Sequence, residues 1–170
     1  YKFVTMLKDS PNLGAGSITE KDDPRVLPVG KLLRITKINE LPQLLNVIRG
    51  EMSLIGPRPH VERDLQGISK KNLKKMLLLK PGLSGIASII FRNEEHIIHS
   101  SYDGRKFYDQ EIAPYKAELE AWYSENINFY MYLLLITITL FKVFNINFLN
   151  PFLLFPSLPE APKNLKKFLD

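Results

Sequence analysis

Apolar positions between residues 40 and 49 recur with the period of an α-helix. They stand at i, i+3, i+4 and i+7 and are Leu41, Leu44, Leu45 and Ile48. This spacing predicts a short amphipathic helix with a single buried apolar face. Asn39 is a favourable N-cap for that helix, and Pro42 is tolerated in its first turn. Gly50 stands where a helix-ending glycine is expected.

The remaining patterns predict a mostly helical domain with a small β element. Residues 2–7 alternate weakly and predict a strand, and residues 26–33 predict a short helix after a turn. The run 83–91 is apolar with small residues, which predicts a buried segment. Residues 94–123 predict a helical region that is broken near Pro114. An α/β fold in one domain with its own core suits a chain of 170 residues.

The C-terminal third contains a long uncharged run at residues 126–141. As a helix it reaches ~24 Å, which is short of the ~30 Å hydrocarbon core of a membrane. A buried core helix and a helix in the membrane interface both fit this length. Aromatic residues near its start favour the interfacial position; they are Trp122, Tyr123, Phe129, Tyr130 and Tyr132. The proline-rich residues 148–170 predict an extended apolar and basic tail beyond a domain at 1–147.

The charge balance narrows the class of partner. A net charge of +5 and a pI of about 9.3 favour nucleic acid, an anionic membrane or a phosphorylated substrate. The lysines of residues 69–80 cluster beside leucines and do not alternate with aromatic residues, so lipid is favoured and no nucleic-acid partner is expected. The alternative for this segment is an ordinary solvated helix.

Other features exclude some kinds of site. The chain has no cysteine, which excludes disulfides, thiolate zinc sites and cysteine nucleophiles. His96 and His99 have a spacing that suits a metal on a helix, but no third ligand is evident nearby, so a metal site is not expected there. His60 is expected to cap its loop. The glycines of residues 14–16 predict a plain loop. Because the chain begins in a strand-like run without an initiator Met, we expect it to be a fragment.

Two charged groups suggest chemistry on phosphate. Glu40 stands at the start of the predicted helix, and Arg58 lies in the stiff turn Gly56-Pro57-Arg58-Pro59. A guanidinium offers phosphate a planar fork of donors, and flanking prolines reduce the entropy lost on fixing it. The alternative for Arg58 is an exposed arginine in a surface turn.

Several motifs in a fixed order carry a resemblance to a known family. They are Asp23-Pro-Arg-Val, Gly30-Lys-Leu-Leu-Arg34, Glu40-Leu-Pro-Gln, Ser53-Leu-Ile-Gly-Pro-Arg-Pro59 and Lys80-Pro-Gly-Leu-Ser-Gly85. Together they resemble the bacterial sugar transferase family, the monotopic phosphoglycosyl transferases. The resemblance covers about residues 1–145 and leaves out the tail.

The resemblance implies an activity and a place in the cell. Members transfer a sugar-1-phosphate from a nucleotide sugar, usually a UDP-sugar, to undecaprenyl phosphate with Mg²⁺ and release the nucleoside monophosphate. They begin the synthesis of glycoconjugates such as O-antigen, capsule or exopolysaccharide at the cytoplasmic face of the bacterial inner membrane. The implied fold is a monotopic, membrane-associated α/β domain with interfacial amphipathic helices. The family's re-entrant membrane helix would precede Tyr1.

The resemblance also implies site residues. Glu40 matches the second member of the family's catalytic Asp-Glu pair, and Asn39 stands where the nucleophilic Asp is expected. Both positions would hold Mg²⁺ in the family. Arg58, Arg34 and Arg25 match basic positions near the nucleotide sugar. Arg92 lies in an altered form of another basic segment.

Asn39 leaves several interpretations open, because a neutral amide is a poor nucleophile and adds no charge to a magnesium site. Three functional interpretations remain: direct attack by the lipid phosphate, Glu40 in the nucleophile's place, or a site that binds substrates with little or no turnover. A plain N-cap is the structural alternative for Asn39. A natural asparagine and an introduced replacement of Asp both fit the sequence.

Overall fold

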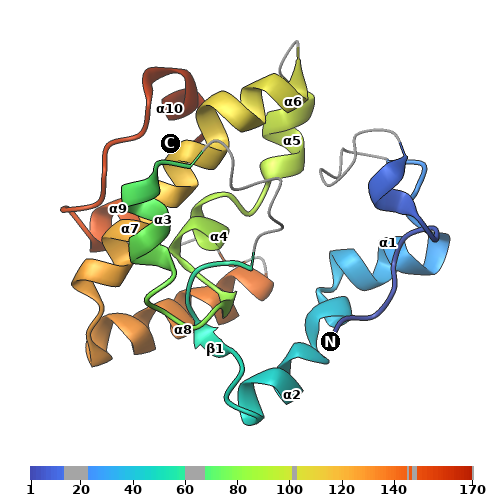
Figure 1. The fold of residues 1–170 in the computed structure, drawn as a ribbon, viewed down its shortest axis with the longest axis horizontal. Helices are drawn as coiled ribbons and strands as arrows, with labels where there is room; N and C mark the ends of the chain where they lie inside the picture. The colour runs from blue at the N-terminus through green and yellow to red at the C-terminus, as the bar shows by residue number, and fades with distance from the viewer. Residues whose placement is uncertain (14–22, 60–67, 101–102, 145, 147–148, 170) are drawn as a thin grey trace.

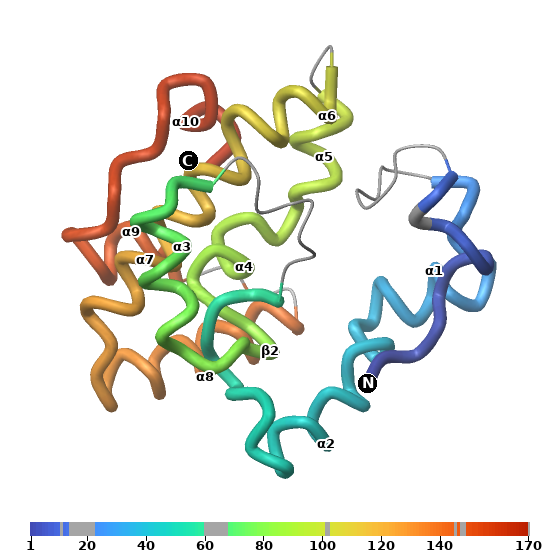
Figure 2. The backbone as a smooth tube through the Cα atoms, in the orientation of Figure 1, coloured from blue at the N-terminus to red at the C-terminus, as the bar shows by residue number. Residues whose placement is uncertain are grey.

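The structure is a computed structural model that describes residues 1–13, 23–59, 68–100, 103–144, 146 and 149–169. The predicted loop at the glycines of residues 14–16 and the predicted cap His60 lie outside the described residues. Figure 1 shows a main body of helices and, to one side of it, an N-terminal segment. That segment contains η1 (Ser10–Asn12), α1 (Pro28–Ile35), η2 (Ile38–Glu40) and α2 (Gln43–Ile48). The α2 helix leads directly into the main body (Figure 2).

A two-stranded parallel sheet follows α2. Its strands are β1 (Ser53–Ile55) and β2 (Gly82–Ser84), paired as Ser53 with Gly82 and Ile55 with Ser84. The connection between them carries α3 (Lys70–Met76). At the end of β1, a Cβ on Gly82 would lie 2.2 Å from the backbone nitrogen of Gly56. Only glycine therefore permits this close approach of the two strands.

The main core is built from helices that follow β2. These are α4 (Ile86–Ile90), α5 (Glu94–His99), α6 (Gly104–Phe107), the π-helical turn η4 (Tyr108–Ile112), α7 (Ala113–Asn126) and α8 (Phe129–Val143). The run 83–91 is largely buried as predicted, with Ile86 and Ile89 in the core. The α/β fold, mostly helical with a small β element, is thus confirmed.

The predicted break at Pro114 takes the form of a π-helical turn. Pro114 has no backbone N–H to donate, and its ring would collide with the carbonyl four residues earlier in a regular helix. The wider turn η4 ends directly before α7, so the helical path continues from α6 to α7.

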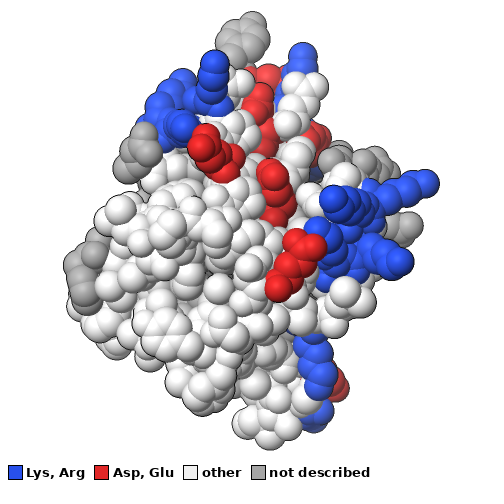
Figure 3. Space-filling view, turned by 90° about the vertical axis from the view of Figure 1, so that its left-hand side faces the viewer, with Lys and Arg blue, Asp and Glu red and all other residues white. Residues whose placement is uncertain are grey.

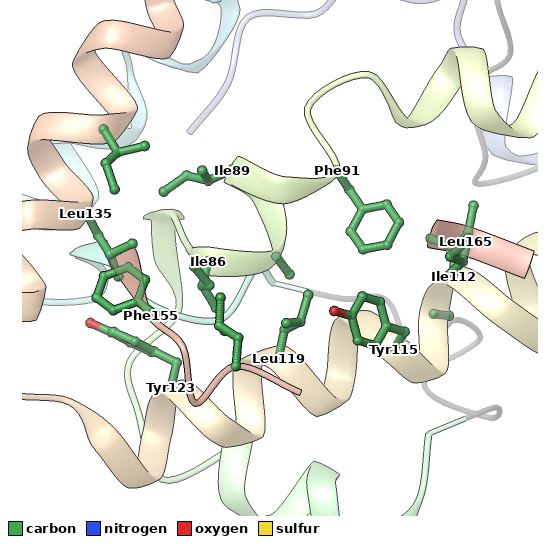
Figure 4. Packing of buried hydrophobic residues seen from close by; sticks show 14 of the residues in the cluster. Ile86, Ile89, Phe91, Ile112, Tyr115, Leu119, Tyr123, Leu135, Phe155 and Leu165 are labelled. Atoms are coloured by element: carbon green, nitrogen blue, oxygen red, sulfur yellow. The ribbon is translucent and has the colours of Figure 1, made fainter. Parts of the chain in front are cut away.

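The C-terminal tail differs from the prediction. It is not extended: it forms α9 (Pro151–Leu154) and α10 (Lys163–Leu169), and Phe155, Leu158 and Leu165 are buried in the main core. Figure 4 shows Leu165 beside Ile112, in agreement with the packing of α10 against η4. The prolines stop long helices, but they do not prevent apolar side chains between them from packing.

Replacing Leu165 by Ala tests this packing. Leu165→Ala should lower the free energy of unfolding by about 2–4 kcal/mol, because a fully buried leucine leaves a cavity. Leu153→Ala in α9 is the matched control, since Leu153 is exposed. Chemical denaturation measures both, and equal small effects would contradict the packing of the tail.

The predicted N-terminal strand is also wrong. Among the described residues, residues 2–7 form a single antiparallel bridge between Met6 and Val26. Leu27 donates to the carbonyl of Thr5 at 3.0 Å, and α1 begins at the next residue. The partner segment turns into a helix at this point, so the ladder cannot continue.

The helix predicted at 40–49 exists, but its surroundings differ. It begins later, at Gln43, with Pro42 as N-cap, so Asn39 caps no helix and lies inside η2. Gly50 has the expected positive φ of 73°. The predicted buried face is exposed: Leu41, Leu44, Leu45 and Ile48 are 38–81% accessible. Periodicity shows that a helix is amphipathic and does not show what covers its apolar side.

Exposed apolar residues also occur on α1, where Val29, Leu32 and Ile35 are accessible.

In the part of the chain that the structure describes, no helix is both long enough and apolar enough to cross a membrane. The α8 helix has 15 residues.

Candidate active site

Glu40 and Arg58 lie together in the structure. Glu40 ends η2, and its Oε1 is 3.8 Å from a guanidinium nitrogen of Arg58 and 3.4 Å from Nζ of Lys2. The side chains of Glu40 and Arg58 are 23% and 51% accessible. Ion pairs this exposed contribute about 0–1 kcal/mol. So weak an ion pair leaves the guanidinium of Arg58 available to another anion at little cost.

Asn39 has an unusual environment beside Glu40. Its backbone carbonyl accepts a hydrogen bond from the N–H of Phe3 at 3.0 Å. Its side-chain Oδ1 is buried and has no hydrogen-bond partner among the described residues. A buried acceptor without a partner costs about 1–3 kcal/mol. Such an atom suits a ligand that supplies a donor or a cation.

Backbone hydrogen bonds to β2 hold the turn that carries Arg58. The N–H of Gly56 donates to the carbonyl of Ser84 at 2.9 Å, and the N–H of Gly82 donates to the carbonyl of Pro57 at 2.8 Å. The two strands thus fix the backbone on the N-terminal side of Arg58. The parallel pair and the flanking prolines together position the guanidinium near Glu40.

Behind this turn lies a buried carboxyl group, Glu120 of α7, which is 1% accessible. Its Oε1 accepts a hydrogen bond from the N–H of Ala87 at 3.3 Å. A Cβ on Gly85 would lie 2.4 Å from the carbonyl oxygen of Gly56 and 2.9 Å from Oε1 of Glu120. Glu120 is therefore packed behind Gly85, which in turn supports the turn that carries Arg58.

Burial raises the pKa of Glu120 to about 8, against the opposing effects of the Ala87 N–H and of Lys116. Its Oε2 and the hydroxyl of Tyr123 are buried without partners among the described residues. Sequence reasoning missed Glu120, because nothing in its spacing distinguishes it from an exposed glutamate.

Lys37 is a second residue that sequence reasoning missed. It precedes η2 with a φ of 58°, a left-handed conformation that is uncommon for a residue other than glycine. Although the residue as a whole is exposed, desolvation of its ammonium by nearby protein lowers the pKa of Lys37. Glu40 opposes this shift, whereas Arg92 and Arg58 add to it. The ammonium therefore belongs to the same group of charges.

Arg92 follows α4, and Lys142 lies in the last turn of α8. Desolvation lowers the pKa of both side chains, and the charge of Arg92 further lowers the pKa of Lys142. The charge of Arg92 also lowers the pKa of Lys37, and substrate binding by Arg92 stays a prediction.

Arg25 has another environment. It is 5% accessible, and its Nε and Nη2 donate to the carboxylate of Asp23 at 2.9 and 2.6 Å. Its Nη1 donates to the carbonyls of Ser10 and Leu13. These contacts tie together the start of the N-terminal segment. Arg34 lies in the last turn of α1. Substrate binding by Arg25 and Arg34 stays a prediction.

Within the described residues, no group of three or more His, Cys, Asp and Glu side chains is arranged to hold a metal ion. His96 and His99 lie on α5 and are exposed.

Comparisons with known proteins agree with these observations. The chain is 37% identical over 106 residues to the undecaprenyl-phosphate galactose phosphotransferase of Salmonella typhimurium. These aligned residues make up 62% of this chain and 19% of that protein. It is 35% identical over 143 residues to the uncharacterized sugar transferase EpsL of Bacillus subtilis. Here the aligned residues make up 84% of this chain and 61% of that protein.

A further relative is the exopolysaccharide production protein ExoY of Sinorhizobium fredii, 50% identical over 74 residues, or 44% of this chain and 32% of that protein. The matched region is thus about a fifth of the Salmonella protein and a third of the Sinorhizobium protein. The family described as bacterial sugar transferase matches residues 1–146, a range that includes Glu40, Arg58 and Arg92. The chain therefore belongs to the bacterial sugar transferase family.

Proposed function

We propose that the chain transfers a sugar-1-phosphate from a UDP-sugar to undecaprenyl phosphate and so initiates a bacterial polysaccharide or other glycoconjugate. The observation that carries this proposal is the meeting of Glu40 and Arg58 beside the buried Asn39 Oδ1 in a member of this family. The Salmonella relative, an undecaprenyl-phosphate galactose phosphotransferase, supports the substrate class.

Two donors at this site suit Mg²⁺, the cofactor that we propose. They are the carboxylate of Glu40 and the unpartnered Oδ1 of Asn39, both oxygen atoms. Because they carry a single negative charge, substrate phosphates would complete the site, as is common for Mg²⁺. When bound, the ion neutralises charge on the diphosphate.

The side chains suggest a direct displacement. An oxygen of the lipid phosphate attacks the phosphorus that carries the sugar, the bond from this phosphorus to the bridging oxygen breaks, and that oxygen leaves with UMP. Arg58 binds the transferred phosphoryl group, and Glu40 orients the reacting groups. Phosphoryl transfer depends mainly on such positioning and charge stabilisation, so it does not require a nucleophile at Asn39.

The test is an assay with the full-length protein, a panel of UDP-sugars, undecaprenyl phosphate and Mg²⁺. Release of UMP that depends on both the sugar nucleotide and the lipid is expected. No UMP release across a broad panel would sink the active-enzyme proposal.

Asn39 favours a second candidate, a homologue that binds nucleotide sugar or polyprenyl phosphate as a partner of an active enzyme. Asn39→Asp separates the two candidates. For the active enzyme we expect the variant to keep Glu40-dependent UMP release within about tenfold of the original rate. A silent original that gains a large activity would support the second candidate.

We also propose that the protein lies on the cytoplasmic face of the inner membrane as a monotopic protein. Figure 3 shows a broad face without charged side chains, bordered by clusters of Lys and Arg with some Asp and Glu between them. Accessible apolar residues occur on α8, among them Phe129 and Tyr130, and after α3, where Leu77 and Leu78 follow a lysine-rich helix. This arrangement of apolar and basic groups suits an anionic lipid surface.

The lysines of α3 provide a test. The chain should bind vesicles that contain anionic lipid, more weakly as salt rises, because exposed charges are screened. Changing Lys70, Lys71 and Lys74 together to Glu should lower the bound fraction several-fold in a sedimentation assay at low salt. The same triple change at Lys163, Lys166 and Lys167 of α10 serves as the control for altered net charge. Retention of the original protein in the aqueous phase at low salt would refute the proposal that this surface binds anionic lipid.

A further inference from the structure

Two hydroxyl groups of the α8 helix make hydrogen bonds to the small sheet. They belong to Tyr132 and Thr139, which are seven residues apart and so lie two turns apart on one face of the helix. The hydroxyl of Tyr132 is 3.1 Å from that of Ser53 in β1, and the hydroxyl of Thr139 is 2.9 Å from that of Ser84 in β2. One helix therefore contacts both strands through polar side chains.

The spacing of the two contacts matches the geometry of the sheet. Ser53 and Ile55 point to the same face of β1, and Ile55 is the register partner of Ser84. Ser53 and Ser84 therefore share a face and stand about 8 Å apart on it, given the usual rise along a strand and the usual distance between strands. Two turns of α8 span about 10.5 Å, so both pairs can form at once. Figure 1 shows β1 beside α8, in agreement with the packing of these elements.

The hydrogen bond between Ser84 and Thr139 has one possible direction. Thr139 donates its hydroxyl proton to the carbonyl of Leu135 at 2.8 Å. A threonine hydroxyl has a single proton, so Ser84 donates and Oγ1 of Thr139 accepts. Loss of the Thr139 hydroxyl would leave the partly buried Ser84 donor without this acceptor. Loss of the Ser84 hydroxyl would leave the bond from Thr139 to Leu135 intact, so the two losses should be unequal.

Ser84 connects α8 to the turn that carries Arg58. Its carbonyl accepts the N–H of Gly56 at 2.9 Å, and Arg58 follows two residues later. The ring of Pro57 fixes its own φ, which limits rotation between Gly56 and Arg58. A shift of β2 relative to α8 would therefore move the guanidinium of Arg58, which lies 3.8 Å from Oε1 of Glu40.

We propose that Thr139 is a positioning residue, which acts through Ser84 to hold Arg58 in place for the transfer reaction. Displacement of a positioning group by about 1 Å can cost about 100-fold in rate, so even a small shift of the turn should be measurable. The role in the reaction rests on the proposed function. The connection from α8 through Ser84 to Gly56 does not depend on any activity.

Thr139→Val removes the acceptor and keeps the shape of the side chain. It should lower the rate of UMP release about tenfold, and Ser84→Ala should lower the rate less, about threefold. Thr139→Ser keeps the hydroxyl and should stay within about twofold of the original rate. Thr137→Val is the matched control, because Thr137 is exposed on the same helix and its hydroxyl donates to the carbonyl of Leu133 in the same way. Equal rates for Thr139→Val and Thr137→Val would overturn the proposal.

A background without Arg58 separates positioning from a general loss of structure. In the Arg58→Ala protein, Thr139→Val should change the remaining rate by less than about twofold, because the group that Thr139 positions is absent. Thermal melts establish that each variant is folded. The same tenfold loss in both backgrounds would overturn the action of Thr139 through Arg58.

Hydrogen exchange of the full-length protein without substrates tests the connection apart from activity. The amide of Gly56 should exchange at least about fivefold faster in Thr139→Val than in the original protein, since its bond to the Ser84 carbonyl opens more often. Thr137→Val should leave this exchange rate unchanged. Equal exchange at Gly56 in the two variants would overturn the connection. Faster exchange in Thr139→Val, together with no UMP release from the original protein, would overturn the proposed function and leave the connection from α8 to the turn in place.

Discussion

Glu40→Gln should lower the rate of UMP release at least about 100-fold, because a carboxylate that positions reacting groups or a cation in phosphoryl transfer is worth several kcal/mol. The exchange keeps the size of the side chain and removes its charge. The ion pairs of Glu40 with Arg58 and Lys2 are exposed, so their loss should change the free energy of unfolding by less than about 1 kcal/mol. Activity should therefore fall without a matching loss of stability.

Glu51→Gln is the matched control, since Glu51 is an exposed glutamate that follows α2. It should leave both the rate and the melting temperature nearly unchanged. Arg58→Lys adds a graded test: the charge stays but the planar fork is lost, and the rate should still fall about tenfold or more. If the Glu40→Gln variant released UMP at the original rate, Glu40 would have no role in the reaction.

Glu120 should make the protein less stable as pH rises from about 4.5 to about 8. Its pKa is near 4.5 in an unfolded chain and about 8 in the folded protein, so the folded state holds the proton more tightly throughout this range. The stabilising effect is complete below the lower value and is lost as pH rises through the upper value. The free energy of unfolding should fall by about 1 kcal/mol per pH unit in this range.

Glu120→Gln isolates this effect, because glutamine keeps an acceptor for the Ala87 N–H and cannot ionise. Denaturant unfolding at pH 5, 6, 7 and 8 should show that the free energy of unfolding of the variant, relative to that of the original protein, increases at each step. UMP release should show the same relative gain at high pH if Glu120 supports the turn that carries Arg58. Parallel stability curves for the two proteins would show that Glu120 is ionised already at low pH.

The sequence supports the helix-rich fold and the proximity of Glu40 to Arg58, because both depend on local patterns. The sequence did not predict the strand β1, which the structure places between α2 and the arginine turn and pairs with β2. The prediction that the apolar face of α2 is buried was wrong, because burial does not depend on local patterns. What covers an apolar face depends on segments far away in the chain, and the main core is made by α4, α7, α8 and the tail.

Lys37 and Glu120 show the same limit at the site. The pKa of Lys37 is affected by the charge of Arg92, which is distant in the sequence, and Glu120 is buried where Gly85 allows Gly56 to approach closely. No period or motif in the sequence marks either residue. Their roles follow from charge and burial, which only the folded chain determines.

The most direct test of the account follows the phosphate itself. A UDP-sugar with a radioactive β-phosphate is incubated with undecaprenyl phosphate, Mg²⁺ and the full-length protein, and the lipid and the denatured protein are then counted separately. The account predicts label in the lipid, at least about 100-fold less with Glu40→Gln, and no label on the protein. Absence of label from the lipid for every sugar, or an equal yield from Glu40→Gln, would contradict it.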